Sequence, residues 1–214
     1  RSGQREQSGS RTLRESGSGN AGTVGVGGAR YSTLRSRKGF VDSGARCGMD
    51  DLTVREATTD DAVAVRRVAR ESWHAAHADI IGPDAVETAI EKWYGEDGLA
   101  ESMRRDDGLF LVAVADDGVV GFAQAVLGEE TGPAWLSRIY VVPARWGDGV
   151  GTVLLDRLER WVRENGEDRL RLAVMADNDV GNAFYDRRGY AVVEEREQDL
   201  FGATVDDCLR EKEL

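Results

Sequence analysis

In the first half of the chain after residue 51, the spacing of apolar residues changes from the period of a strand to the period of a helix. Its opening residues alternate between apolar and polar types, and Thr58 followed by Asp61 is typical of a capping box that begins a helix. Apolar side chains then recur every three or four positions. The elements predicted here are a strand over Leu52–Ala57, a helix that ends near His74, and helices over Pro83–Trp93 and Leu99–Met103.

The second half of the chain contains three strands in quick succession before its helices return. Asp117-Gly118 is a strong signal for a tight hairpin, so the strands on either side of it should run antiparallel. The elements predicted here are strands over Leu109–Val114, Val119–Leu127 and Trp135–Val142, a helix over 150–165, a strand over Arg169–Val174, a short helix between Asn178 and Gly189, a strand over Tyr190–Val193, and a further strand toward Leu209.

With the short helix over Leu99–Met103 counted together with the helix before it, the order of these elements is β-α-α-β-β-β-α-β-α-β, with one more strand expected at the end. A doubly wound α/β fold would alternate strand and helix from its first strand, and this chain does not. The order therefore predicts the α+β class.

Residues 1–48 differ in composition from the rest of the chain. They hold nine Lys and Arg against three Asp and Glu, with much Gly and Ser and few large apolar residues. Such a segment cannot bury enough apolar surface to offset the entropy of ordering it, so we expect a disordered basic tail. Because the composition changes at Met49, we expect the native start there and a single functional domain over 49–214.

The remainder of the chain is strongly acidic, since the whole sequence carries 39 Asp and Glu against 28 Lys and Arg. A surface of this charge repels nucleic acid, so no nucleic-acid partner is expected. No apolar run reaches the length of a transmembrane helix, so no membrane partner is expected either. Cys47 and Cys208 are too few for a disulfide scaffold, which favours a reduced, cytoplasmic protein.

Three alternating glycines, Gly147, Gly149 and Gly151, lie between an apolar strand that ends at Pro143 and an amphipathic helix. Glycine lets a backbone approach a ligand closely, and the first turn of a helix offers free N–H groups and a positive dipole end. This arrangement suits a phosphate or diphosphate. Taken alone it is also consistent with a flexible turn, and its spacing differs from the Gly-x-Gly-x-x-Gly of dinucleotide-binding folds.

A second segment, from Asn178 to Tyr190, makes the interpretation of the glycine turn more specific. Together the two resemble motifs of the GCN5-related N-acetyltransferase (GNAT) family: a strand with Pro-x-x-x-Gly-x-Gly-x-Gly over Ile139–Thr152, and an Asn-x-x-Ala-x-x-x-Tyr-x-x-x-Gly-Phe type segment. Gly181 stands where the family has Ala, and Trp146 stands where it usually has Gln or Arg. The resemblance implies a mixed, mostly antiparallel sheet with flanking helices.

The resemblance also implies a site for acetyl-CoA and the direct transfer of its acetyl group to an amine. Tyr185 would be the catalytic residue, as the general acid that protonates the departing thiolate. The strand before the turn would pair with the pantetheine arm, and the turn would wrap the diphosphate. The cofactor-binding residues implied are Ile139, Tyr140, Val141, Arg145, Gly147, Asp148, Gly149, Val150, Gly151, Thr152 and Asn178.

Two of these residues have a structural alternative. Tyr185 lies at the end of an apolar helix, where a tyrosine is often a core residue whose hydroxyl is bonded within the protein. Asn178 precedes the same helix and can be a plain N-cap, a role that does not exclude cofactor binding.

The acceptor side of the site is less well marked. The family places its acceptor among the first helices, so the candidates for the substrate cleft are Glu71, Trp73, His74 and Glu129. The carboxylates and the histidine are alternatively solvated surface groups, and the sequence does not identify a general base. No His, Cys and Asp cluster has metal-ligand spacing, so no metal is expected.

Two functions are therefore open. The first is an acetyl-CoA-dependent N-acetyltransferase that acts on a primary amine of a small molecule or peptide. The second is a non-catalytic acyl-CoA-binding sensor, and an intact Tyr185 favours the enzyme. Because many members of the family dimerise, a homodimer is compatible with the resemblance, although no stretch of the sequence marks an interface.

Overall fold

The structure is a computed structural model that describes residues 52–116, 118–128 and 132–214. The predictions for the tail over 1–48, for Met49, and for Cys47, Asp117 and Glu129 lie outside these residues. The helices are α1 (Ala62–Ile81), α2 (Pro83–Trp93), α3 (Glu96–Met103), α4 (Val150–Glu164) and α5 (Asp179–Arg187). The strands are β1 (Thr53–Glu56), β2 (Gly108–Ala115), β3 (Gly118–Val126), β4 (Ala134–Val141), β5 (Arg169–Met175), β6 (Ala191–Leu200) and β7 (Ala203–Glu213).

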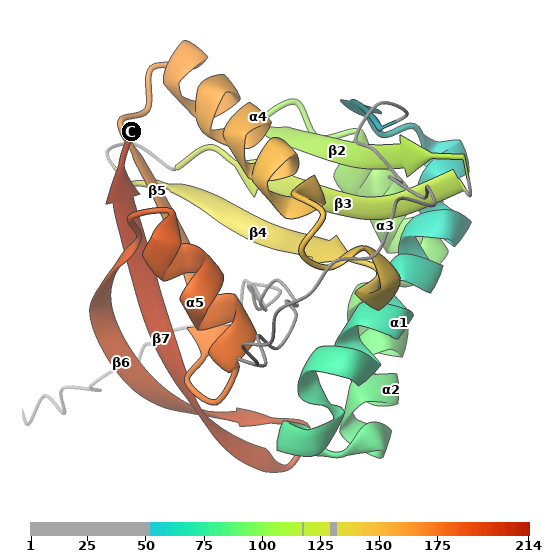
Figure 1. The fold of residues 1–214 in the computed structure, drawn as a ribbon, viewed down its shortest axis with the longest axis vertical. Coiled ribbons are helices and arrows are strands. Elements are labelled where there is room, and N and C mark those ends of the chain that lie inside the picture. Colours follow the sequence, from blue (N-terminus) through green and yellow to red (C-terminus); the bar gives the residue numbers. More distant parts are fainter. Residues whose placement is uncertain (1–51, 117, 129–131) are drawn as a thin grey trace, which may run out of the picture.

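A seven-stranded sheet forms the centre of the molecule, in the order β1-β2-β3-β4-β5-β7-β6 (Figure 1). Neighbouring strands are antiparallel except β4 and β5, which are parallel. The prediction of a mixed, mostly antiparallel sheet with flanking helices is confirmed, as is the antiparallel pairing of β2 with β3.

Helices cover both faces of the sheet. A Cβ atom at Gly121 on β3 would come within 3.2 Å of Val150 on α4, whereas the ring of the next residue, Phe122, lies 6.2 Å from that of Tyr94 at the end of α2. Because successive strand residues point to opposite faces, α4 covers one face and α2 covers the other. Helix α5 lies on the same face as α4 (Figure 1), since Arg188 at its end pairs with Asp156 on α4.

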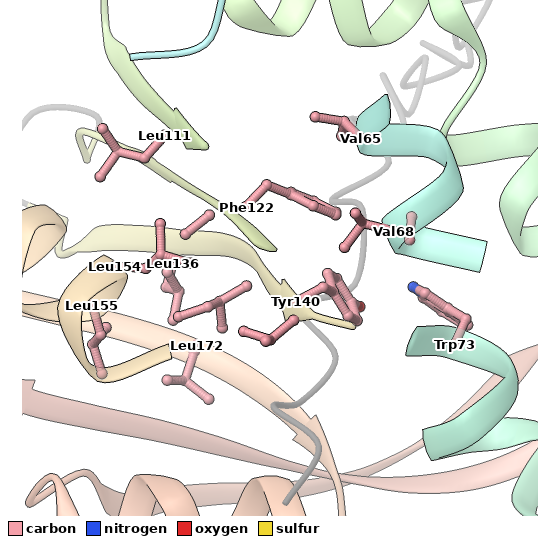
Figure 2. Close-up of a cluster of buried hydrophobic side chains, with 14 of the residues drawn as sticks. Val65, Val68, Trp73, Leu111, Phe122, Leu136, Tyr140, Leu154, Leu155 and Leu172 are labelled. Carbon is pink, nitrogen blue, oxygen red and sulfur yellow. The ribbon is translucent and has the colours of Figure 1, made fainter. Parts of the chain in front are cut away.

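The core has two parts, one on each side of β4. Figure 2 shows Tyr140 turned toward Trp73 of α1 and Leu136 beside Leu154 of α4. The change of face between them is caused by a β-bulge, because Gln124 and Ala125 on β3 pair with Arg138 and Leu136 and leave Ser137 as an extra residue. The bulge therefore lets one strand supply both sides of the core.

The local signals for helix ends are confirmed. Thr58 N donates to the carboxylate of Asp61 over 2.8 Å, as in a capping box. Helix α4 ends at Asn165 and Gly166, where Gly166 adopts a φ of 87° and Glu167 N donates to Val162 O over 3.2 Å. This geometry satisfies the last carbonyl groups of the helix.

The predicted end of the first helix is wrong, because α1 continues from His74 to Ile81. The inward-facing series of Ala69, Trp73, His77 and Ile81 keeps a spacing of four residues, and all four side chains are buried. The helix ends at Gly82, which has a φ of 85° and precedes the proline that begins α2.

The last two strands are longer than predicted. Strand β6 extends to Leu200 instead of Val193, and β7 extends to Glu213 instead of Leu209. Most of β6 is exposed, so its residues lack the alternation of buried and exposed positions by which a half-buried strand is recognised.

Candidate active site

Strands β4 and β5 separate soon after they meet (Figure 1). Their parallel pairing consists of Ala134 with Leu170 and Trp135 with Arg171, and within the described chain no later residue of β4 pairs with β5. The remainder of β4 stays paired with β3 up to Val141. A gap therefore opens in the sheet at the end of β4 that leads into the glycine turn.

Backbone groups on one side of β4 face this gap. Val142 N donates to Val120 O over 2.9 Å, so Val142 and Tyr140 direct their peptide groups toward β3. In an antiparallel ladder the intervening residues direct theirs the opposite way. The N–H and C=O groups of Ile139 and Val141 consequently lie on the side of the gap, where an extended ligand could pair with those not bonded within the protein, as an added strand.

The glycine turn leads directly into the N-terminus of α4. Gly147 and Gly149 have φ angles of 89° and 85°, which only glycine adopts without strain. Val153 N donates to Gly149 O over 3.1 Å and closes the first turn of the helix. The N–H groups of Val150, Gly151 and Thr152 precede this bond and have no acceptor within the helix, so they are available to an anion.

Gly121 on β3 sets how closely α4 approaches the sheet. A Cβ atom there would lie 3.0 Å from Tyr140 O and 3.2 Å from a methyl group of Val150. A side chain there would crowd both the strand and the helix, so glycine allows the first turn of α4 to sit close against β3 and β4. This packing places the free N–H groups beside the end of β4.

The glycine turn carries a basic side chain, an acidic side chain and a tryptophan. Arg145 Nε lies 3.5 Å from the carboxylate of Asp148, which reduces the negative charge of the turn. Trp146 is half-buried and donates from its Nε1 to Val141 O over 2.6 Å. The indole thus contacts the end of β4.

Asn178 lies at the end of β5 and caps α5. Its Oδ1 accepts from Gly181 N over 2.9 Å, which confirms the predicted N-cap. The side chain is buried, and its Nδ2 has no hydrogen-bond partner among the described residues. A buried amide donor without an acceptor is costly, so this group is suited to a ligand carbonyl.

Tyr185 on α5 is fully buried, with an exposed fraction of 0%. Its ring packs edge-on against Phe184 and Tyr190, but its hydroxyl has no hydrogen-bond partner in the described part of the chain. A core tyrosine normally has its hydroxyl bonded within the protein, and the Tyr185 hydroxyl lacks such a bond. Burial raises the pKa of the Tyr185 phenol, and the charge of Arg210 partly offsets this shift.

Two residues that the sequence did not single out hold α5 on the sheet. Asn182 Nδ2 donates to the carbonyl oxygens of Met175 and Asn178, at the end of β5 and before the helix. Arg210 on β7, which is almost fully buried, donates from its Nε to Asn182 Oδ1 over 3.1 Å. Asn182 follows Asn178 by one helical turn, which was a usable signal, whereas the contact with Arg210 spans 28 residues and left none.

The predicted acceptor residues do not gather at one point. Trp73 is fully buried and donates from its Nε1 to Tyr94 OH over 3.1 Å, so it belongs to the core. Glu71 is exposed and pairs with Arg67 over 2.9 Å.

His74 contacts α2 instead of the gap. Its Nε2 lies 2.5 Å from Glu87 Oε1, and this hydrogen bond, with one from Arg70, lowers the pKa of the Glu87 carboxyl. The side chain is half-buried and already engaged in this hydrogen bond. Glu129, the fourth candidate, lies outside the described residues.

His77, one turn further along α1, is a buried polar group. Its ring lies 4.9 Å from that of Trp73, and neither ring nitrogen has a hydrogen-bond partner among the described residues. Burial lowers the pKa of His77 to about 3. The imidazole is therefore neutral at physiological pH.

No three His, Cys, Asp or Glu side chains within the described ranges are grouped so as to hold a metal ion. Cys208 on β7 is buried as a free thiol, and burial raises its pKa. None of the described helices is both long enough and apolar enough to cross a bilayer.

Comparison with known proteins agrees with this geometry. The Acetyltransferase (GNAT) family matches residues 67–190. A spermidine N(1)-acetyltransferase of Thermoplasma acidophilum is 30% identical over 145 residues, which cover 66% of this chain and 89% of that protein. An aminoglycoside N(6')-acetyltransferase type 1 of Stenotrophomonas maltophilia is 33% identical over 122 residues, which cover 53% of this chain and 69% of that protein.

A solved structure has the same architecture. The PaiA N-acetyltransferase of Thermoplasma acidophilum, crystallised in complex with coenzyme A, superposes with a TM-score of 0.67 and 29% sequence identity, over 76% of this chain and 99% of that chain. The family match covers more than half of the sequence and includes β4, the glycine turn and α5. This chain belongs to the GNAT family of acetyltransferases.

Proposed function

We propose that this protein transfers the acetyl group of acetyl-CoA directly to a primary amine of a small cationic molecule. The observation that carries the proposal is the gap between β4 and β5, which opens beside the first turn of α4. Extended backbone and a helix N-terminus meet there, as an extended arm with a diphosphate at one end requires.

Acetyl-CoA supplies an activated acetyl group as a thioester. The N–H and C=O groups of Ile139 and the N–H group of Val141 would align its pantetheine arm, and Asn178 Nδ2 would bind an amide carbonyl of that arm. The N–H groups of Val150, Gly151 and Thr152 would bind the diphosphate with the positive end of the α4 dipole. The related PaiA enzyme, whose structure contains coenzyme A, supports coenzyme A as the ligand.

Tyr185 is proposed as the general acid. The amine nitrogen attacks the thioester carbonyl, a C–N bond forms, the C–S bond breaks, and the departing thiolate takes the phenolic proton. Because burial raises the pKa of Tyr185, its hydroxyl is protonated throughout the physiological range and the proton is present. The amine nitrogen releases its own proton to water, and Tyr185 is reprotonated from solvent.

A covalent acetyl-enzyme is not part of the proposal. Cys208 is the cysteine within the described chain, and it is buried on β7 with a raised pKa. A thiol of this kind is protonated and shielded, whereas a nucleophilic cysteine needs an accessible thiolate. Direct transfer therefore fits the residues better.

The charge of the β6–β7 hairpin supports a cationic acceptor. Strand β6 is largely exposed, and the hairpin is linked to the acceptor side by Phe201 at its tip, whose ring lies 4.9 Å from that of Trp93 on α2. Negative potential raises the local concentration of a cation. Spermidine and aminoglycosides, the substrates named for two relatives, are such cations. The acidic residues of the hairpin are Glu194, Glu195, Glu197, Asp199, Asp206, Asp207, Glu211 and Glu213, against the basic residues Arg196, Arg210 and Lys212.

Release of free thiol from acetyl-CoA tests the proposal. The panel contains spermidine, an aminoglycoside, single amino acids and peptides with a free N-terminus, each with and without the enzyme. We expect thiol release with the polyamine or the aminoglycoside and the weakest release with neutral amino acids. Tight binding of acetyl-CoA without thiol release on any amine would contradict the proposal and favour an acyl-CoA sensor.

A further inference from the structure

The carbonyl oxygen of Val141 accepts hydrogen bonds from side chains of two other elements. Ser72 Oγ on α1 donates to it over 2.9 Å, and Trp146 Nε1 in the glycine turn donates over 2.6 Å. Ser72 is buried and Trp146 is half-buried, so both bonds are largely shielded from water. One peptide group at the end of β4 thus joins a strand, a helix and the turn.

This carbonyl group lies on the side of β4 that faces the gap, because Val142 directs its N–H to Val120 on β3. A carbonyl oxygen has two lone pairs, and both are occupied here. An amide N–H of a bound pantetheine arm would find no free acceptor at Val141. The Val141 N–H still faces the gap as a donor.

The other backbone bonds of the turn are local. Arg145 N donates to Val142 O over 2.9 Å, Trp146 N donates to Pro143 O over 3.2 Å, and Asp148 N donates to Arg145 O over 3.3 Å. Bonds between residues three apart shape the turn but do not fix it against the sheet. The indole bond reaches back five residues to β4 and fixes the turn there.

We propose that Trp146 and Ser72 are positioning residues of the acetyl-CoA site, which act through the Val141 carbonyl. Trp146 stands where the family usually has Gln or Arg, and here it orients the turn that presents the N–H groups of Val150 and Gly151 to the diphosphate. Ser72 ties the same carbonyl to α1, on the acceptor side. This inference rests on the proposed acetyl-CoA site.

Binding of coenzyme A to the purified protein, measured by calorimetry, tests the inference with Trp146→Phe. This variant keeps an aromatic ring and removes the N–H. The loss of one hydrogen bond corresponds to an affinity for coenzyme A about three- to ten-fold weaker than that of the wild type. The KM for acetyl-CoA should rise by a similar factor, while kcat and the KM for the amine stay unchanged. Ser72→Ala should weaken binding in the same direction.

Trp161→Phe is the matched control, because Trp161 is a half-buried tryptophan near the other end of α4. The affinity of the Trp161→Phe variant for coenzyme A should equal that of the wild type. Thermal unfolding of every variant shows that it is folded at the assay temperature. Unchanged or tighter binding by Trp146→Phe would overturn the inference and leave the proposed function intact. An unmodified protein that binds no coenzyme A would instead overturn the proposed function.

Discussion

Arg210 on β7 donates from its Nη1 to Asp186 Oδ1 on α5 over 2.5 Å and to Tyr190 O over 3.0 Å. These bonds, with that to Asn182, connect a buried guanidinium to three points around the helix that carries Tyr185. The position of the proposed general acid therefore depends on a residue 25 positions later in the chain.

Arg210→Gln removes this connection. Because several acceptors lose a charged donor, we expect the free energy of unfolding to fall by about 2–4 kcal/mol. We also expect kcat to fall more than the affinity for coenzyme A, since α5 carries the acid while the glycine turn carries the diphosphate site. Urea unfolding with steady-state kinetics measures both. Arg105→Gln, which breaks an exposed ion pair with Asp107, should cost less than about 1 kcal/mol. Equal losses in the two variants would contradict the special role of Arg210.

Tyr185→Phe separates chemistry from folding. Removal of a general acid lowers kcat by about 10²-fold or more. The hydroxyl has no partner among the described residues, so its loss should leave the free energy of unfolding equal or slightly higher. Coenzyme A affinity should be unchanged by calorimetry. A variant with full turnover would remove Tyr185 from the mechanism, and a strongly destabilised one would indicate a structural hydroxyl.

Asn178 combines two roles that different substitutions separate. Asn178→Asp keeps an oxygen that can accept from Gly181 N and removes the Nδ2 donor, so stability should persist while coenzyme A affinity falls. Asn178→Ala removes both groups and should also cost about 1 kcal/mol of stability. Calorimetry and thermal unfolding of the pair provide the test. Equal affinity for coenzyme A in Asn178→Asp and the wild type would restrict Asn178 to capping.

His77 predicts a specific dependence of stability on pH. Burial lowers its pKa to about 3 in the folded protein, whereas an unfolded histidine has a pKa of about 6.5. Between these values the unfolded chain binds a proton that the folded chain does not, so stability falls as the pH falls. The loss should reach about 2 kcal/mol between pH 7 and pH 5.

His77→Phe should lack this component, since phenylalanine does not titrate. Both proteins are unfolded in urea at a series of pH values, and the difference in their free energies of unfolding isolates the histidine. The difference should shift in favour of the variant as the pH is lowered to 5. Parallel curves for the two proteins would show that His77 is protonated equally in both states.

The sequence predicted most of the fold where the signals were local. The glycine turn, the Asn178 cap and the Asn165-Gly166 end of α4 each depend on a few neighbouring residues, and the structure confirms their geometry. The end of α1 was placed seven residues too early because the inward position after Trp73 holds His77, which does not continue the apolar spacing in the sequence. A polar residue on the buried face therefore hid the last part of the helix, although Gly82 and Pro83 mark its true end.

The contacts that assemble the site were not predictable in the same way. Ser72 bonds to a carbonyl 69 residues away, and Arg210 bonds to a helix more than 20 residues before it. Neither contact leaves a spacing in the sequence, because each forms only when the strands take their final order. The gap between β4 and β5 has the same origin.

A crystal structure of the protein with coenzyme A tests the central claim most directly. The account predicts the pantetheine arm in the gap beside Ile139 and Val141, with the diphosphate on the N–H groups of Val150, Gly151 and Thr152. Coenzyme A bound at any other surface, with the gap filled by side chains of the protein, would contradict it.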